Sequence, residues 1–232
     1  MKTLIFFFLF ANIVFSSEIF DEIGRYRTKI PDIQEIPVNK SNEQIYFNFL
    51  SYQINIQTFI SKPATIIIEQ DTVLLLKQSI NFKIWGEYFD KVVSFDFDNN
   101  GLKDICIISV PVGCSGDAAN IIQANAILFF KNKPPKIYTF SSFFVIENLF
   151  GDYNNDNIFD WVCIKQIRKT GKIFYVANVF SIINGKITNL SKEMKTFPMC
   201  FLQKNGFMHI EKVSPFLRND LIFDNPNIFL IK

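Results

Sequence analysis

Histidine is almost missing from this chain of 232 residues, which contains a single one. One histidine cannot build a histidine-rich zinc site or supply a pair of histidine general bases. Neither sign of charge predominates, because the chain has 24 Lys and Arg and 22 Asp and Glu. A formal net charge of +2 gives no strong reason to expect a nucleic-acid partner. Any chemistry of this chain therefore depends on carboxylates, amides and the main chain.

Apolar residues are abundant instead. Hydrophobic residues make up 49% of the chain and aromatic residues 16%, with 28 Phe against only 9 Gly and 9 Pro. This apolar content is enough to offset the entropy of ordering the chain, which excludes a disordered acidic or basic tail protein. The composition predicts a well-packed globular protein.

The N-terminus has the pattern of a secretory signal peptide over residues 1–17. Lys2 precedes an apolar run from Leu4 to Phe15, and the small residues Ser16 and Ser17 follow. A membrane anchor is the alternative, but the run is shorter than the roughly 20 residues that span a bilayer. We therefore expect cleavage and a secreted or periplasmic protein, with no stable membrane insertion afterwards.

Four cysteines would enter the oxidising compartment, which permits up to two disulfides: Cys106, Cys114, Cys163 and Cys200. None forms a CxxC pair, so the sequence does not favour zinc. Cys106 and Cys114 are the best pair by proximity. Cys106 also lies in an apolar run, where it can equally be a buried thiol.

The rest of the chain predicts β-structure nearly throughout. Residues 18–43 are expected to be an irregular lead-in, followed by a single β-rich domain over 44–232. Short runs rich in Ile, Val, Phe, Tyr and Thr recur between turn residues, as strands do, at 45–49, 54–60, 65–69, 72–76 and 80–85. Gln70 and Asp71 are expected to form a tight connection.

Two Asn-Gly pairs, Asn184-Gly185 and Asn205-Gly206, predict hairpins, because a type I′ turn needs positive φ at both central residues. No long helical periodicity follows the signal peptide. We predict an all-β fold with a propeller-like or sandwich arrangement of antiparallel hairpins.

A loop of alternating acids and amides begins at Asp96, and a second begins 56 residues later at Asp152. Side chains at positions 1, 3, 5 and 9 of such a loop turn inward, and position 7 contributes its main-chain carbonyl. The predicted ligands are Asp96, Asp98, Asn100, Leu102 and Asp104 in the first loop, and Asp152, Asn154, Asp156, Ile158 and Asp160 in the second.

Six to eight hard oxygen ligands suit calcium, and each loop offers three carboxylates to offset its charge. Position 6 must turn through left-handed φ, which Gly101 permits freely and Asn157 tolerates. Neither loop is a complete EF-hand, because position 12 is Ile107 or Cys163 where an EF-hand has its bidentate Glu. Each loop leads into an apolar strand instead of a helix.

These loops and their spacing resemble the FG-GAP/VCBS repeat family, whose blades carry a DxDxDGxxD calcium loop before a hydrophobic strand. The resemblance implies β-propeller-like repeats at about 90–145 and 146–200 and a calcium-stabilised scaffold. The chain departs from the motif at Asn100, Asn154 and Asn157. Two repeats cannot close a propeller, which typically needs at least about four blades.

Three functional hypotheses follow. The favoured one is an exported, non-enzymatic calcium-binding protein whose loops contact a protein or glycan. A second is a periplasmic lysozyme inhibitor or immunity-type protein that inserts the loop at 111–120 into an enzyme cleft. The third is a carboxylate-dependent hydrolase with an acid/base pair chosen from Asp96, Asp104, Asp152 and Asp160. Turns alone also explain Asp and Asn clusters, since both residues bond to their own backbone.

Overall fold

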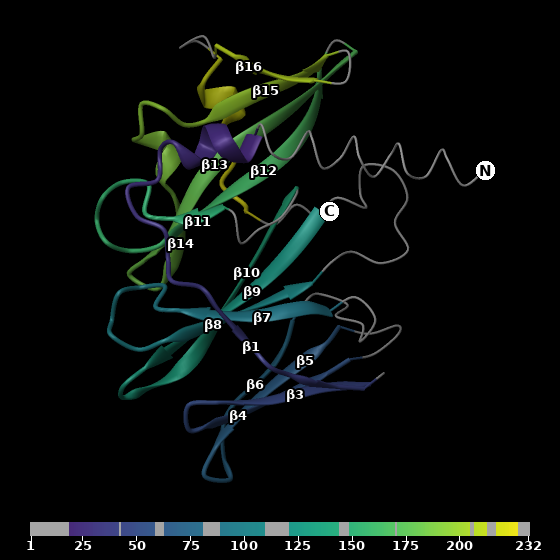
Figure 1. Cartoon of the computed structure of the whole chain (residues 1–232), viewed down its shortest axis with the longest axis vertical. Helices are drawn as coiled ribbons and strands as arrows, with labels where there is room; N and C mark the ends of the chain where they lie inside the picture. The colour runs from purple at the N-terminus through teal and green to yellow at the C-terminus, as the bar shows by residue number, and fades with distance from the viewer. Residues whose placement is uncertain are drawn as a thin grey trace, which may run out of the picture. The chain divides into compact units, whose positions relative to one another are not determined.

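The residues that the structure describes form antiparallel β-sheets and one α-helix, at residues 19–24 (Figure 1). It is known from a computed structural model that describes residues 19–41, 43–58, 63–80, 89–109, 121–143, 149–169, 171–204, 207–212 and 217–226. The predicted all-β class is confirmed. A propeller finds no support.

The chain divides into two compact units, where the sequence predicted a single β-rich domain over 44–232. One unit is Pro31–Ser141, and the other combines the residues up to Ile30 with those from Ser142 onward. The N-terminal helix therefore packs with the C-terminal half of the chain, which no local pattern reveals.

Unit Pro31–Ser141 contains two five-stranded sheets. The first, in the order β1-β7-β8-β9-β10, is formed by Gln34–Ile36, Phe89–Phe95, Asp104–Ser109, Ile121–Phe130 and Lys133–Phe143. The second, in the order β2-β3-β4-β5-β6, is formed by Asn39–Lys40, Gln44–Phe49, Tyr52–Gln57, Thr65–Gln70 and Val73–Ser79. The two sheets share one core, as a sandwich does.

That core forms because alternate residues of each strand point inward. In β3 the buried positions are Ile45, Phe47 and Phe49, and the residues between them are exposed. From the other sheet, the Phe129 ring stacks on Tyr52 with 4.4 Å between the ring centroids. The central strand β8 is buried along its whole length, which matches its continuous apolar run.

The other unit is built on a six-stranded sheet. Its strands are β11 (Phe150–Gly151), β12 (Asp160–Lys169), β13 (Lys172–Ile183), β14 (Lys186–Asn189), β15 (Met199–Lys204) and β16 (Phe207–Glu211), with 3-10 helices η3 (Leu190–Lys192) and η4 (Asn219–Leu221). Ile19 and Ile23 of the helix are fully buried in this unit.

The segment 18–43 is less irregular than predicted, since it contains the helix and strands β1 and β2. Strand β1 exists because β7 offers it a free edge, with Gln34 opposite Ser94. Pro31 and Pro37 flank the strand and interrupt the alternating pattern from which a strand is predicted, so no local pattern indicated this pairing.

The turn at Asn184-Gly185 is confirmed, with φ of 52° and 72° between β13 and β14. The tight connection after β5 lies one residue later than predicted, at Asp71 and Thr72, because Gln70 still pairs with Val73. Strands β15 and β16 pair on either side of the second Asn-Gly, whose own residues lie outside the described part.

Several predictions concern residues outside the described ranges. They are the signal peptide over 1–17, the loop at 111–120 with Cys114, and most of the strand at 80–85. Within the described residues, no helix is both long and apolar enough to cross a bilayer.

Candidate metal centre

The first predicted loop connects β7 to β8 and brings three carboxylates together. One oxygen each of Asp96, Asp98 and Asp104 lies within 4.8 Å of the other two. Asp104 is fully buried, whereas Asp96 and Asp98 are half-buried. Among the described residues, this is the one group of three acids, cysteines or histidines with such spacing. The group can hold a metal ion.

The main chain of the loop curls around the Asp96 carboxylate. Asn100 and Gly101 donate their N–H groups to its two oxygens at 3.1 and 2.9 Å. Gly101 has a φ of +83°, as predicted for the sharp turn at position 6. Leu102 donates its N–H to Asn100 Oδ1 at 2.8 Å. The predicted ligation by the Leu102 carbonyl stays a prediction.

Asp104 fastens the end of the loop to two strands. Its Oδ2 accepts the N–H of Phe97 at 2.9 Å, and its Oδ1 accepts the N–H of Phe129 on β9 at 2.8 Å. The Asn100 amide donates to the carbonyl of the same Phe129 at 3.0 Å. Residue 129 was missed by the sequence analysis, because its contribution comes from the main chain and carries no side-chain signal.

The crowding of carboxylates is costly without a counter-charge. Burial raises the pKa of Asp104 to about 8, the N–H groups of Phe129 and Phe97 oppose this, and the neighbouring Asp98 and Asp96 raise it further. Burial also raises the pKa of Asp98, with a smaller contribution from Asp96. Asp98 Oδ1 is buried and accepts no hydrogen bond. A cation at the cluster removes this electrostatic cost.

The second loop repeats the backbone plan of the first. Asn157 donates its N–H to Asp152 Oδ2 at 3.0 Å, as Gly101 does to Asp96, and has a φ of +67°. Tyr153 donates its N–H to Asp160 Oδ2 at 3.0 Å. Gly151 lies opposite Asp160 in the ladder, as Phe95 lies opposite Asp104. The two loops were therefore correctly aligned by their sequence spacing.

The side chains of the second loop are arranged differently. The Asn154 amide donates to Asp156 Oδ2 at 2.8 Å, so the side chains at positions 3 and 5 bond to each other. Asp156 Oδ1 accepts the N–H of Ile158 at 2.8 Å. Burial raises the pKa of Asp160 to about 7. The three acids of this loop do not meet the spacing found in the first loop.

A segment just after the helix clamps the second loop. Thr28 donates both its N–H and its hydroxyl to the carbonyl of Asp152, at 2.8 and 2.9 Å. The Asp152 N–H donates to the carbonyl of Lys29 at 2.9 Å. This bridge buries Asp152, which is 1% exposed. Sequence reasoning missed the clamp, since it joins residues more than a hundred positions apart.

Of the two alternatives predicted for Cys106, a disulfide with Cys114 or a buried thiol, the structure shows the buried thiol. Cys163 and Cys200 are buried thiols too. The single histidine, His209, lies on β16 opposite Leu202.

Comparison of the chain with protein-family models, with curated proteins and with solved structures found no match. The resemblance to FG-GAP/VCBS repeats thus rests on the loop residues themselves.

Proposed function

We propose that this chain is a calcium-binding β-protein in which the ion occupies the first loop. The observation that supports it most is the approach of the Asp96, Asp98 and Asp104 oxygens to within 4.8 Å, with Asp98 Oδ1 buried and unpaired. Oxygen ligands from carboxylates, an amide and a main-chain carbonyl are those that calcium prefers. Asn100 and Leu102 complete the proposed ligand set.

The second loop is proposed as a weaker calcium site. Asp152, Asn154, Asp156, Ile158 and Asp160 hold its ligand positions, but the bond from Asn154 to Asp156 must open before both can face an ion. Its clamp to Thr28 and Lys29 already holds the loop without a metal.

The role of the ion is structural in this proposal, and the protein is not an enzyme. Asp104 has the raised pKa of a general acid, yet it is fully buried and both its oxygens accept main-chain N–H groups. A catalytic carboxyl must reach a substrate atom. This arrangement favours a bound cation over a hydrolase.

Export and partner binding complete the proposal. The signal-peptide pattern at residues 1–17 supports a secreted or periplasmic location, where calcium is available. Loops around the sheets are proposed to contact a protein or glycan. The narrower idea of a lysozyme inhibitor depends on the loop at 111–120, which lies outside the described residues.

Thermal unfolding in calcium, in magnesium and in chelator tests the proposal. Calcium at about a hundred times its dissociation constant stabilises the folded state by about 2.7 kcal/mol, a shift that is easily measured. Magnesium should stabilise less, because it demands a tighter octahedral shell. Identical midpoints in calcium and chelator would contradict the proposal.

A further inference from the structure

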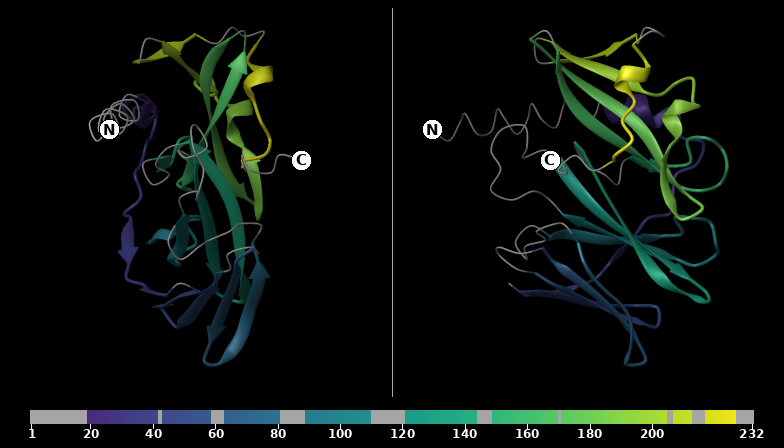
Figure 2. Two further views of the ribbon diagram at one scale, coloured as in Figure 1. Left: turned by 90° about the vertical axis from the view of Figure 1, so that its right-hand side faces the viewer. Right: turned by 180° about the vertical axis from the view of Figure 1, so that it is seen from behind.

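A C-terminal segment, residues 217–226, lies along the sheet of its own unit (Figure 2). It contains η4 and then runs in a non-helical conformation beside β13 and η3. Of its ten residues only Pro226 is buried. The segment is therefore held mainly by polar contacts.

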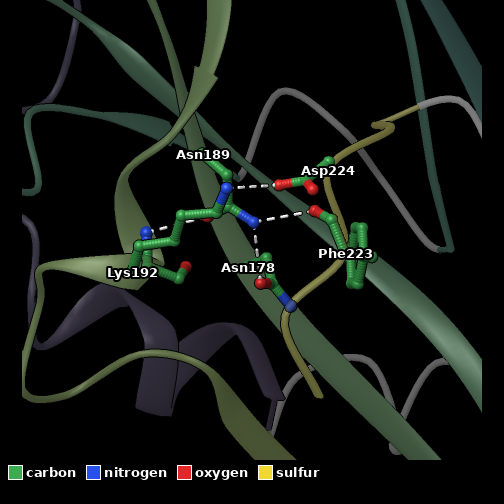
Figure 3. A network of polar contacts seen from close by, with 6 residues as sticks. Asn178, Asn189, Lys192, Phe223 and Asp224 are labelled. Atoms are coloured by element: carbon green, nitrogen blue, oxygen red, sulfur yellow. Dashed lines mark hydrogen bonds and ion pairs between the residues drawn. The ribbon is translucent and has the colours of Figure 1, made fainter. Parts of the chain in front are cut away.

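Two asparagine amides hold its main chain. Asn178 donates to the carbonyl of Leu221 at 3.1 Å. Asn189 donates to the carbonyl of Phe223 at 2.7 Å (Figure 3). Their orientation is determined, because the N–H of Ser191 donates to Asn189 Oδ1 and the amide of Asn189 donates to Asn178 Oδ1. Both NH₂ groups must therefore point at the segment.

Side-chain contacts indicate which residue types the surface prefers in the segment that it binds. The ring of Phe223 packs against Phe180 with 5.7 Å between centroids, and Lys165 Nζ lies 4.1 Å from the centroid of the Phe223 ring. The next residue, Asp224, forms an ion pair of 2.6 Å with Lys192. The surface thus binds an aromatic residue followed by an acid.

The two asparagines belong to the sheet, whereas Arg218 at the start of the segment donates to the carbonyls of Ser191, Met194 and Phe197 and fixes the segment beside η3. Asn178 and Asn189 come from paired strands and are 0% and 7% exposed. If the segment leaves, these buried amides lose their acceptors, and any extended chain that supplies two alternate carbonyls restores the bonds.

We propose that this surface, formed by Asn178, Asn189, Lys165, Phe180 and Lys192, is a binding site for an extended peptide, and that residues 217–226 occupy it as an intramolecular ligand. The ligand class is an extended segment with an aromatic residue followed by Asp or Glu. This surface is where the protein partner of the proposed function would bind, and in that respect the proposal rests on the proposed function. It does not involve calcium.

A full-length variant with a weakened segment and an unchanged surface tests the proposal. Phe223→Ala with Asp224→Lys removes the ring contact with Phe180 and replaces the ion pair with Lys192 by repulsion between two lysines. Every residue of the surface is kept. Leu217→Ala with Asp220→Lys is the matched control, because it makes the same charge change at exposed positions of the same segment. If the first variant does not fold, Asp224→Lys alone replaces it, since Asp224 is exposed.

The probe is a fluorescein-labelled synthetic peptide with the sequence of residues 217–226, measured by anisotropy in chelator. The weakened variant should bind it at least about tenfold more tightly than the wild type or the control does. A peptide carrying the same two substitutions should bind at least about tenfold more weakly. Thiol labelling followed by mass spectrometry reports release of the segment, because Cys163 Sγ donates to the Pro226 carbonyl at 3.5 Å.

Faster labelling of Cys163 together with tighter peptide binding supports the proposal. Faster labelling without peptide binding overturns it, as does equal binding of the natural and the substituted peptide. Unchanged labelling and unchanged binding in a folded variant also overturn it. The proposed occupant is a segment of another protein, because residues 217–226 already fill the surface within their own chain. Light scattering of the wild type should therefore show a monomer, and a dimer that the weakened segment abolishes would assign the occupant to a second copy and overturn this assignment. A failure of the calcium test leaves these outcomes unaffected.

Discussion

The carboxylate of Asp104 accepts the main-chain N–H of Phe129, 25 residues further along the chain, at a distance of 2.8 Å. The bond ties the end of the first loop to strand β9, while the other oxygen of Asp104 accepts the N–H of Phe97 inside the loop. One side chain thereby satisfies two buried donors and positions the acid cluster at the edge of the core.

Asp104→Ala should destabilise the protein by about 2–6 kcal/mol, because two buried N–H groups lose their acceptor at about 1–3 kcal/mol each. Asp96→Ala is the matched control. It also removes the acceptor of two N–H groups, but those of Asn100 and Gly101 are at exposed residues that water can reach, so the cost should stay at about 1 kcal/mol or less. Urea unfolding in chelator measures both, and equal costs would contradict the anchoring role of Asp104.

Asp98→Asn should weaken calcium binding by about tenfold or more, because it removes one of three carboxylates from the first loop. The same acid-to-amide change in the second loop, Asp156→Asn, should leave the tighter calcium affinity within about twofold. Isothermal titration of both folded variants measures the difference. A larger loss from Asp156→Asn would assign the tighter site to the second loop.

Gly151→Ala should destabilise the clamp on the second loop. A Cβ at this position meets Arg27 Cδ at 2.5 Å and Cγ at 2.7 Å, and the carbonyl of Lys29 at 3.2 Å. Overpacking of this kind typically costs about 1–3 kcal/mol. Arg27→Ala should recover part of that loss, because it removes the two closest atoms while the Lys29 carbonyl remains.

A double-mutant cycle of these two changes, followed by thermal unfolding, gives the coupling. We expect a coupling energy above about 0.5 kcal/mol. Strictly additive effects would show that the two side chains do not meet in solution.

Cys200 should react slowly with thiol reagents near neutral pH. Burial raises the pKa of its thiol from 9.0 to about 11, and the nearby Glu211 adds to the shift. The thiolate is the reactive form, so labelling at about pH 8 should be about a hundredfold slower than for a thiol of ordinary pKa and should rise with pH up to about 11.

The same shift has a consequence for stability. The unfolded thiol ionises first, so the stabilising contribution of neutral Cys200 is complete below about pH 9 and is lost as the pH rises towards 11. Labelling of Cys200 at the rate of an unfolded peptide at pH 8 would contradict the burial of this side chain.

Most of the β-structure could be predicted because its signals are local. The run from Ile45 to Phe49 alternates buried and exposed side chains, and Asn184-Gly185 accepts the positive φ that a two-residue hairpin demands. The loop at Asp96 was found in the same way, since its hydrogen bonds to Asn100 and Gly101 lie within five residues of it.

Contacts between distant segments could not be predicted. β1 forms on the edge of β7, and Thr28 bonds to Asp152, although neither segment carries a strong strand pattern of its own. Asn178 in the middle of an apolar strand was a detectable signal of a buried hydrogen-bonded position, but its partner is the main chain of Leu221.

By itself, the sequence determined the all-β class, the hairpin turn at Asn184-Gly185 and the two aligned acidic loops, because these depend on side-chain alternation and on φ preferences within a few residues. Only the tertiary structure decided that the carboxylates of the first loop converge while Asn154 bonds to Asp156 in the second, and that the C-terminal segment lies on β13. In the first loop the Asn100 amide bonds to the carbonyl of Phe129 on a distant strand, whereas in the second loop the Asn154 amide bonds to Asp156 within the loop. Which distant main-chain group lies within hydrogen-bonding distance follows from how the strands pack, and the spacing of residues in the sequence does not show it.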